Sequence, residues 1–362
     1  MKKHLSLLLI LTLLLSLLVG CGSTNTPAES ETPASEQTES TQSSEPAEAP
    51  AETPTETPAE ESDTVLPRLM VLSGPTGVGA AKLLADNESA AEEEKCVASA
   101  EVVADNEAVK NALVSGETDI AAVATNLAAT LFNKTNGSLE VLAVNTLGVL
   151  YLLENGESVQ SMSDLAGKTL YATGQGANPE YVLNYLLSKN GVEPADVDIQ
   201  WLTPQEITAK MTAGEPAICM LPVPAATAVL MKAPEVRQAL SLSEAWDALG
   251  EGPLTQGCIV VRREFAEQHP AAVERFLEAY RDSLAYMSDE ANRADASELV
   301  AHFEITPNAQ IAAKALPQCN LTFLTGNEMK SALESFYQVL LAANPASVGG
   351  ALPDASFYYG AD

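Results

Sequence analysis

The sequence predicts an α/β protein with two lobes, preceded by an export signal and an acidic spacer. From about residue 65 onward, apolar strand-like runs alternate with segments of helical spacing, a pattern typical of parallel βαβ units. This part is about 300 residues long, more than one compact core usually holds. Its strand–loop–helix pattern also starts afresh after Leu153, without a visible repeat of sequence.

The amino terminus predicts an exported, lipid-anchored protein. Lys2 and Lys3 precede a mostly apolar run at 5–18, which is shorter than the ~18–20 residues that span a bilayer and so indicates a secretory signal. Residues 18–21, Leu-Val-Gly-Cys, resemble the bacterial lipobox. The resemblance implies cleavage before Cys21, a diacylglycerol on its sulfur and a further acyl chain such as palmitate on its amine. The alternative is an ordinary signal peptide followed by a chance cysteine.

The segment 22–64 predicts an extended tether. It repeats Thr, Pro, Ala, Glu and Ser, contains 11 acidic residues and has neither aromatic nor basic side chains. Such a composition buries too little apolar surface to fold, and charge repulsion and proline keep it extended. A specific acidic binding arm is the functional alternative to a solvated spacer.

The charge of the remaining chain argues against nucleic acid as a partner. Without the two signal lysines and the spacer acids, 17 basic residues stand against 38 acidic ones, a net charge near −21. Nucleic-acid binding needs a basic surface. A local basic pocket remains an alternative, because the net charge says nothing about the charge of an individual pocket.

The cysteines and histidines do not predict a metal site. The four cysteines after Cys21 form no CxxC pair, and only His269 and His302 accompany them. Export permits disulfides, but the spacing of the cysteines does not show which of them pair. Cys219 and Cys258 lie in apolar strand-like runs, so buried free thiols are the reading we favour, and whether Cys96, Cys219, Cys258 and Cys319 form disulfides stays undecided.

The elements follow in three series. The first predicts strands at 69–72, 97–103, 120–124 and 139–145 with helices at 80–85, 107–115 and 127–132. The second predicts strands at 169–172, 198–202 and 217–221 with helices at 179–188, 206–213 and 225–231. The third, from residue 257, predicts a strand at 258–261 and helices at 271–287, 294–303 and 328–342.

Three loops between a strand and a helix predict a ligand site, at 73–79, 125–126 and 173–177. Ligands of open α/β sheets bind at the carboxyl ends of strands. Helix N-termini offer unpaired N–H groups there, and glycines allow close approach to the backbone. Ordinary loops with helix caps are the alternative. The candidate ligand residues are Ser73, Gly74, Thr76, Gly77, Thr125, Asn126, Asn145, Thr173, Gly174, Gln175, Gly176 and Pro222.

Four segments resemble the nitrate/taurine/sulfonate (SsuA-like) type of ABC substrate-binding proteins. They are the run DIAAVATN at 119–126, SDLAGKTL at 163–170, the glycine turn and helix at 176–187, and RREF at 262–265 followed by His-Pro. The resemblance covers most of 68–345. It implies a type II periplasmic-binding fold, two α/β lobes with a ligand cleft between them.

The resemblance also implies the organisation and role of the chain. The implied parts are a signal peptide at 1–20, the acidic spacer at 21–64, lobe 1 at 65–152 plus 255–362, and lobe 2 at 153–254. We expect a monomer on the outer face of the cytoplasmic membrane, without cofactor, that binds a small molecule and works with an ABC permease and ATPase. Ligands of this family include nitrate, taurine, alkyl sulfonates and thiamine precursors, and the sequence leaves the ligand open.

Two other functions compete with import. A sensor or adhesin would use the same fold without transport. A hydrolase would need a base, for which only His269 and His302 are available, and no G-x-S-x-G motif is present. Paired-carboxylate chemistry stays open because acids are many, but we expect a binding protein rather than an enzyme.

Overall fold

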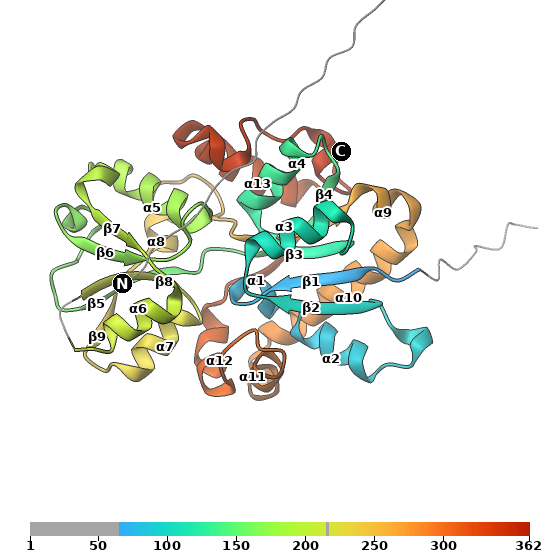
Figure 1. Cartoon of the computed structure of the whole chain (residues 1–362), viewed down its shortest axis with the longest axis horizontal. Coiled ribbons are helices and arrows are strands. Elements are labelled where there is room, and N and C mark those ends of the chain that lie inside the picture. The colour runs from blue at the N-terminus through green and yellow to red at the C-terminus, as the bar shows by residue number, and fades with distance from the viewer. Residues whose placement is uncertain (1–64, 215–216) are drawn as a thin grey trace, which may run out of the picture. The chain divides into compact units, whose positions relative to one another are not determined.

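The computed structural model describes residues 65–214 and 217–362, which form two mixed β-sheets surrounded by helices (Figure 1). The predicted signal peptide, the lipidation site Cys21 and the acidic spacer lie outside the described residues. Within these residues, no helix is both long and apolar enough to cross a membrane.

The first sheet has six strands in the order β2-β1-β3-β10-β4-β11. Its strands are β1 (Arg68–Leu72), β2 (Ser99–Val103), β3 (Ile120–Ala124), β4 (Leu139–Thr146), β10 (Gly257–Arg262) and β11 (Leu321–Leu324). β1 is parallel to β2 and β3, whereas β10 is antiparallel to both β3 and β4. The carboxyl ends of β1, β2 and β3 therefore meet at one edge.

The second sheet has five strands in the order β7-β6-β8-β5-β9. They are β5 (Leu150–Asn155), β6 (Thr169–Ala172), β7 (Asp198–Trp201), β8 (Ala217–Pro222) and β9 (Val236–Ser241). β6 is parallel to β7 and β8, and β5 is antiparallel to β8 and β9. Both sheets thus share one plan, because the first strand after each passage between sheets, β5 or β10, lies antiparallel between two other strands.

The helices cover the two sheets and join them. They are α1 (Pro75–Val78), α2 (Ala81–Ser89), α3 (Asn106–Ser115), α4 (Thr125–Lys134), α5 (Asn178–Lys189), α6 (Pro204–Met211), α7 (Ala225–Lys232), α8 (Leu242–Asp247), α9 (Arg263–Gln268), α10 (Pro270–Ser288), α11 (Arg293–His302), α12 (Ala309–Ala315) and α13 (Gly326–Ala343). Short 3₁₀ turns lie at Glu92–Glu94, Met162–Leu165, Pro194–Asp196, Glu290–Asn292, Leu316–Gln318, Pro345–Val348 and Ala355–Phe357. Late in the chain, α12 packs against α7 and α13 against α5, so helices that follow β10 contact helices of the second sheet.

The helices and strands predicted from the sequence are confirmed, with ends that differ by a few residues. The sequence did not predict α1, α8, α9 and α12, nor β5, β9 and β11. β5 begins with four consecutive apolar residues, 150–153, and ends in Glu154 and Asn155, and β9 is only partly buried. Neither strand therefore has the alternating pattern by which half-buried strands are recognised.

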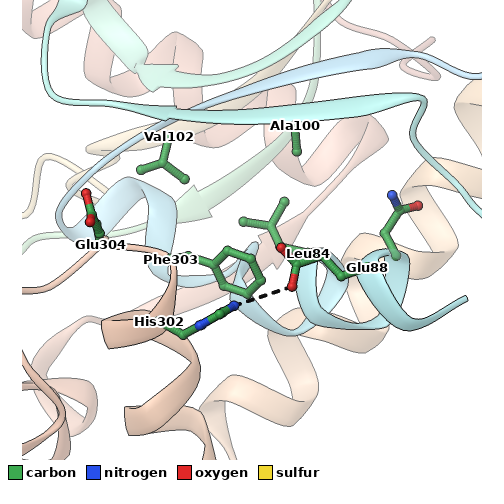
Figure 2. A pocket seen from close by; sticks show the side chains of 8 residues that line it. Leu84, Glu88, Ala100, Val102, His302, Phe303 and Glu304 are labelled. Carbon is green, nitrogen blue, oxygen red and sulfur yellow. Dashed lines mark hydrogen bonds and ion pairs between the residues drawn. The ribbon is translucent and has the colours of Figure 1, made fainter.

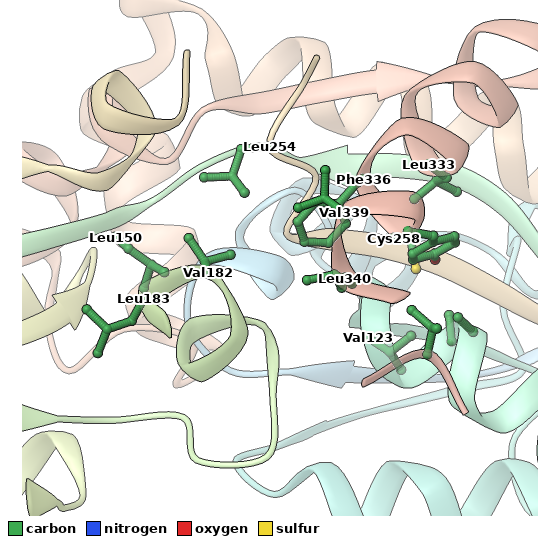
Figure 3. Packing of buried hydrophobic residues seen from close by; sticks show 14 of the residues in the cluster. Val123, Leu150, Val182, Leu183, Leu254, Cys258, Leu333, Phe336, Val339 and Leu340 are labelled. Atoms are coloured by element: carbon green, nitrogen blue, oxygen red, sulfur yellow. The ribbon is translucent and has the colours of Figure 1, made fainter. Parts of the chain in front are cut away.

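Apolar packing continues from one sheet to the other (Figure 3). Phe336 of α13 contacts Trp246 of α8, with ring centroids 5.6 Å apart, and Trp246 lies 5.3 Å from Tyr185 of α5. Trp246 is fully buried and belongs to the core. The buried free thiols expected at Cys219 and Cys258 are confirmed, and the other two described cysteines, Cys96 and Cys319, are buried and free as well. Burial raises the pKa of Cys219 and of Cys319 to about 12.

Candidate functional site

A cavity of about 820 Å³ lies where the two sheets face each other across helix starts and loops. Its wall consists of the end of β1, the start of α6, the turn between β8 and α7, and the connection from α11 to α12. Ligand sites for small molecules commonly measure ~300–1,000 Å³. The lining residues are Ser73, Gly74, Pro75, Ala104, Thr203, Pro204, Gln205, Pro222, Val223, Pro224, Ala225, Ala301, Glu304, Ile305, Thr306 and Pro307. We call this cavity the cleft.

Three of the predicted ligand residues, Ser73, Gly74 and Pro222, line the cleft. The Ser73 amide donates to the Val103 carbonyl oxygen at 2.8 Å, and the Gly74 amide donates to the Ile305 carbonyl oxygen at 3.1 Å. Gly74 has φ +87°, a conformation that favours glycine. The backbone of the loop after β1 is thus anchored, while the Ser73 hydroxyl remains at the cleft.

Thr76 and Gly77 lie behind the cleft, in the short helix α1, and do not line it. A Cβ atom at Gly77 would collide with the Leu72 carbonyl oxygen and approach a Val71 methyl carbon to 2.9 Å. Close packing of the backbone therefore explains this glycine.

Asn145, at the end of β4, is fully buried and does not line the cleft. Its Nδ2 donates to the Thr76 carbonyl oxygen at 2.9 Å and to Tyr280 Oη at 2.8 Å, and its Oδ1 accepts from Thr146 Oγ1 at 3.1 Å. Both of its N–H groups are thus used in joining β4 to α1 and α10. Burial raises the pKa of Tyr280, which keeps its hydroxyl protonated within this network.

Thr125 and Asn126 begin α4 and contact the start of α5 instead of the cleft. Asn126 Oδ1 accepts a hydrogen bond from the Asn178 amide at 3.2 Å. Asn178 Nδ2 donates to Thr125 Oγ1 at 2.8 Å and to the Gln256 carbonyl oxygen at 2.9 Å. Because all three side chains are buried, the two helix starts meet directly in a polar contact shielded from water.

The glycine loop after β6 does not line the cleft either. Thr173 and Gly174 are partly exposed, and Gln175 and Gly176 are exposed. The Gly176 amide donates to Glu180 Oε2 at 2.6 Å, within the loop's own helix start. The structure thus places this loop on the same sheet edge as Pro222, but away from the cavity that Pro222 lines.

Sequence reasoning missed several residues of the cleft, including Thr203, Gln205, Glu304 and Thr306. A signal existed for Thr203, which forms a capping box with Glu206: the Thr203 amide and hydroxyl donate to Glu206 Oε2 at 2.9 and 2.8 Å. No local pattern marks Glu304, which comes from the connection between two helices.

A second cavity of about 360 Å³ lies on the other side of Glu304 (Figure 2). His302 and Phe303 face Leu84 and Glu88 of α2 there, and His302 Nε2 lies 3.4 Å from Glu88 Oε2. His302 and Glu88 are exposed, so this contact contributes little to stability. Within 65–214 and 217–362, no three His, Cys, Asp or Glu side chains are grouped so as to hold a metal ion.

Comparisons with known proteins agree with this geometry. A family model described as NMT1/THI5 like matches residues 99–294, more than half of the chain. No curated protein sequence matches.

Solved structures show the same fold at low sequence identity. An ABC transporter structure from Parabacteroides distasonis is 23% identical with a TM-score of 0.66, and the match covers 81% of this chain and 98% of that one. The periplasmic aliphatic sulphonate-binding protein SsuA from Escherichia coli is 18% identical with a TM-score of 0.63, covering 81% and 92%. The periplasmic nitrate-binding protein NrtA from Synechocystis PCC 6803 is 14% identical with a TM-score of 0.56, covering 78% and 84%. The predicted fold, two α/β lobes of the periplasmic-binding type, is confirmed.

Proposed function

Because the chain belongs to the NMT1/THI5-like family, we propose that it is an extracytoplasmic solute-binding lipoprotein that delivers a small molecule to an ABC importer. The resemblance to the nitrate/taurine/sulfonate type of binding proteins is confirmed by the same family match and fold. Family membership supports binding and transport, with a permease and an ATPase as partners, rather than catalysis.

The observation that carries the proposal is the composition of the cleft wall. Ser73 follows a strand of the first sheet, Pro222 ends a strand of the second, and Ile305 belongs to the connection between α11 and α12. A ligand in this cavity would touch parts of the chain that move relative to one another if the two sheets rotate. Such hinge closure is the usual response of two-lobed binding proteins to their ligands.

We further propose that the hinge divides the chain into lobe 1 at 65–152 plus 255–362 and lobe 2 at 153–254. Thr173, Gly174, Gln175 and Gly176 are proposed to approach the ligand on closure, because their loop leaves the same edge of the second sheet as Pro222. For the anchor, we propose acylation of Cys21, which holds the monomer at the outer face of the cytoplasmic membrane.

The experiment that tests the proposal measures small-molecule binding to the chain from residue 65 onward. Protein purified from cells is denatured, and released molecules are identified by mass spectrometry and then titrated back by calorimetry. Ala104→Trp fills the cleft from an exposed position and should abolish binding, whereas Ala294→Trp, on an exposed part of α11, should not. A molecule that binds both variants equally would place its site elsewhere.

A further inference from the structure

The charge of the cleft restricts what it can bind. Among the described residues that line it, Glu304 alone carries a formal charge, and none is Lys, Arg or His. The other polar side chains are the neutral groups of Ser73, Thr203, Gln205 and Thr306. Five prolines contribute apolar and rigid surface. No side chain in this wall can form an ion pair with an anion.

Glu304 is held in place by its backbone. Its φ is +55°, uncommon for a residue with a side chain, and its amide donates to the Ala301 carbonyl oxygen at 3.1 Å. The next residues are fixed as well, since the Ile305 carbonyl oxygen accepts from the Gly74 amide and the Thr306 amide donates to Val300. Residues held in such sparsely populated conformations occur often at ligand sites. The backbone therefore fixes where the exposed Glu304 side chain starts, at the rim of the cleft.

The helix starts at the cleft do not replace the missing cations. A helix N-terminus can bind an anion through free N–H groups. At α6, however, the carboxylate of Glu206 already accepts two hydrogen bonds from Thr203, so a negative charge is in place. At α7, which begins after Pro224 without a side-chain cap, the first amides can donate to a neutral carbonyl oxygen or to an anion, but they carry no full positive charge. The net charge near −21 of the chain beyond residue 64 adds a field that repels anions.

We infer that the ligand of the cleft is an uncharged or cationic organic molecule, with its positive or hydrogen-bond-donating group against Glu304. This inference rests on the proposed function and narrows its substrate class. Enclosing an anion here would remove its hydration without supplying an ion-pair partner, which is costly. A carboxylate that accepts from a cationic donor forms the stronger, charge-assisted type of hydrogen bond. The cleft thus favours a different ligand charge from that of sulphonates or nitrate, which are anions.

The test uses fractions of small molecules from yeast and bacterial extracts, separated by ion exchange into anionic, neutral and cationic pools. Each pool, and sodium nitrate and sodium ethanesulfonate as defined anions, is added to the protein, and the thermal midpoint is measured. We expect the neutral or the cationic pool to raise the midpoint of the native sequence and not that of Ala104→Trp. Stabilisation by any anion that Ala104→Trp abolishes overturns the inference while leaving the proposed function intact. No stabilisation by any pool counts against the proposed function itself.

A second variant tests the role of Glu304. The molecule purified from the active pool should bind Glu304→Gln about three- to tenfold more weakly, a modest loss because Glu304 is exposed to water and salt. Glu298→Gln removes an exposed acid of α11 that does not line the cleft, and should bind as the native protein does. Thermal midpoints without ligand verify that both variants fold. Equal affinity of all three proteins would remove Glu304 from the site.

Discussion

The backbone amide of Asn178 donates a hydrogen bond to Oδ1 of Asn126, 3.2 Å away, so a side chain at the start of α4 caps α5. α4 follows a strand of the first sheet, and α5 follows a strand of the second. The contact is therefore part of the joint between the two halves of the protein.

Loss of the Asn178 side chain should destabilise the protein. Asn178→Ala would leave Thr125 Oγ1 without a donor and the Gln256 carbonyl oxygen with the Thr125 amide as its remaining donor, in a buried place, at a cost of about 1–3 kcal/mol. Asn126→Ala removes one cap and should cost about 1 kcal/mol. Urea unfolding of both variants and of the double variant measures these losses. The two substitutions remove different hydrogen bonds, since the Asn178 amide remains in Asn178→Ala, but these bonds adjoin in one buried contact, so the loss in the double variant should differ from the sum; strict additivity would show that the two bonds act independently.

The glycines of the loop after β1 should respond differently to substitution. Gly77→Ala places a Cβ atom against the Leu72 carbonyl oxygen, which belongs to β1, and should cost more than about 2 kcal/mol. Gly74→Ala meets open space, and its cost comes from the backbone alone: φ +87° with ψ −157° lies in a region that is essentially restricted to glycine, at a cost on the order of 1–3 kcal/mol. Chemical denaturation gives both values. A loss below about 1 kcal/mol at Gly77 would show that α1 shifts to accept the methyl group.

Acid should weaken the protein partly through Asp119. Burial by itself would raise the pKa of this carboxyl, but hydrogen bonds from Arg68 at 2.7 and 2.8 Å and the charge of Arg262 lower it below its usual value. A lowered folded-state pKa gives stability that is present above the unfolded value of ~3.9 and is lost as pH falls through the folded value. The ion pair should thus matter most at neutral pH.

Asp119→Asn tests this pH dependence. At pH 7 it should cost on the order of 2 kcal/mol, less than a fully buried pair, because the Arg68 side chain is 42% exposed. Urea unfolding between pH 7 and about pH 3 should show the difference from the native protein shrinking toward acid. Glu298→Gln is the control, with a small effect at every pH. A difference that stays constant with pH would attribute the loss to geometry and not to charge.

The lipid anchor is testable through Cys21. Cells fed a labelled fatty acid should incorporate the label into the native protein, and Cys21→Ala should carry none and leave the membrane fraction. This outcome follows from the Leu-Val-Gly-Cys run, since two or more acyl chains anchor stably. Equal labelling of both proteins would contradict acylation at this residue.

Local patterns predicted the fold well and the cleft in part. Ser73 and Gly74 could be predicted because the strand, the glycine turn and the helix that surround them are contiguous in sequence. Asn178 and Glu304 could not. Asn178 lies 52 residues from Asn126, and Glu304 reaches the cleft only because its neighbour Ile305 accepts a hydrogen bond from Gly74.

The predicted ligand residues that do not line the cleft also show what sequence patterns cannot distinguish. Asn145, Thr125 and Asn126 stand at strand ends or helix starts, where ligand contacts and helix caps require the same polar side chains. Only the packing distinguishes the two roles: Asn145 is fully covered and bonded to Thr76 and Tyr280. Periodicity and spacing contain no information about which side of a loop becomes buried.

The insertion of β10 between β3 and β4 has a consequence for biosynthesis. β3 and β4 are complete once residue 146 has been made, yet their shared neighbour consists of residues 257–262. The first sheet therefore cannot be completed while the second is being synthesised. The edges of β3 and β4 that pair with β10 lack this partner until more than a hundred further residues have been made. Contacts so distant in sequence form slowly and leave strand edges open to other chains in the interval. A growing or translocating chain of this protein should thus depend on chaperones until β10 has emerged.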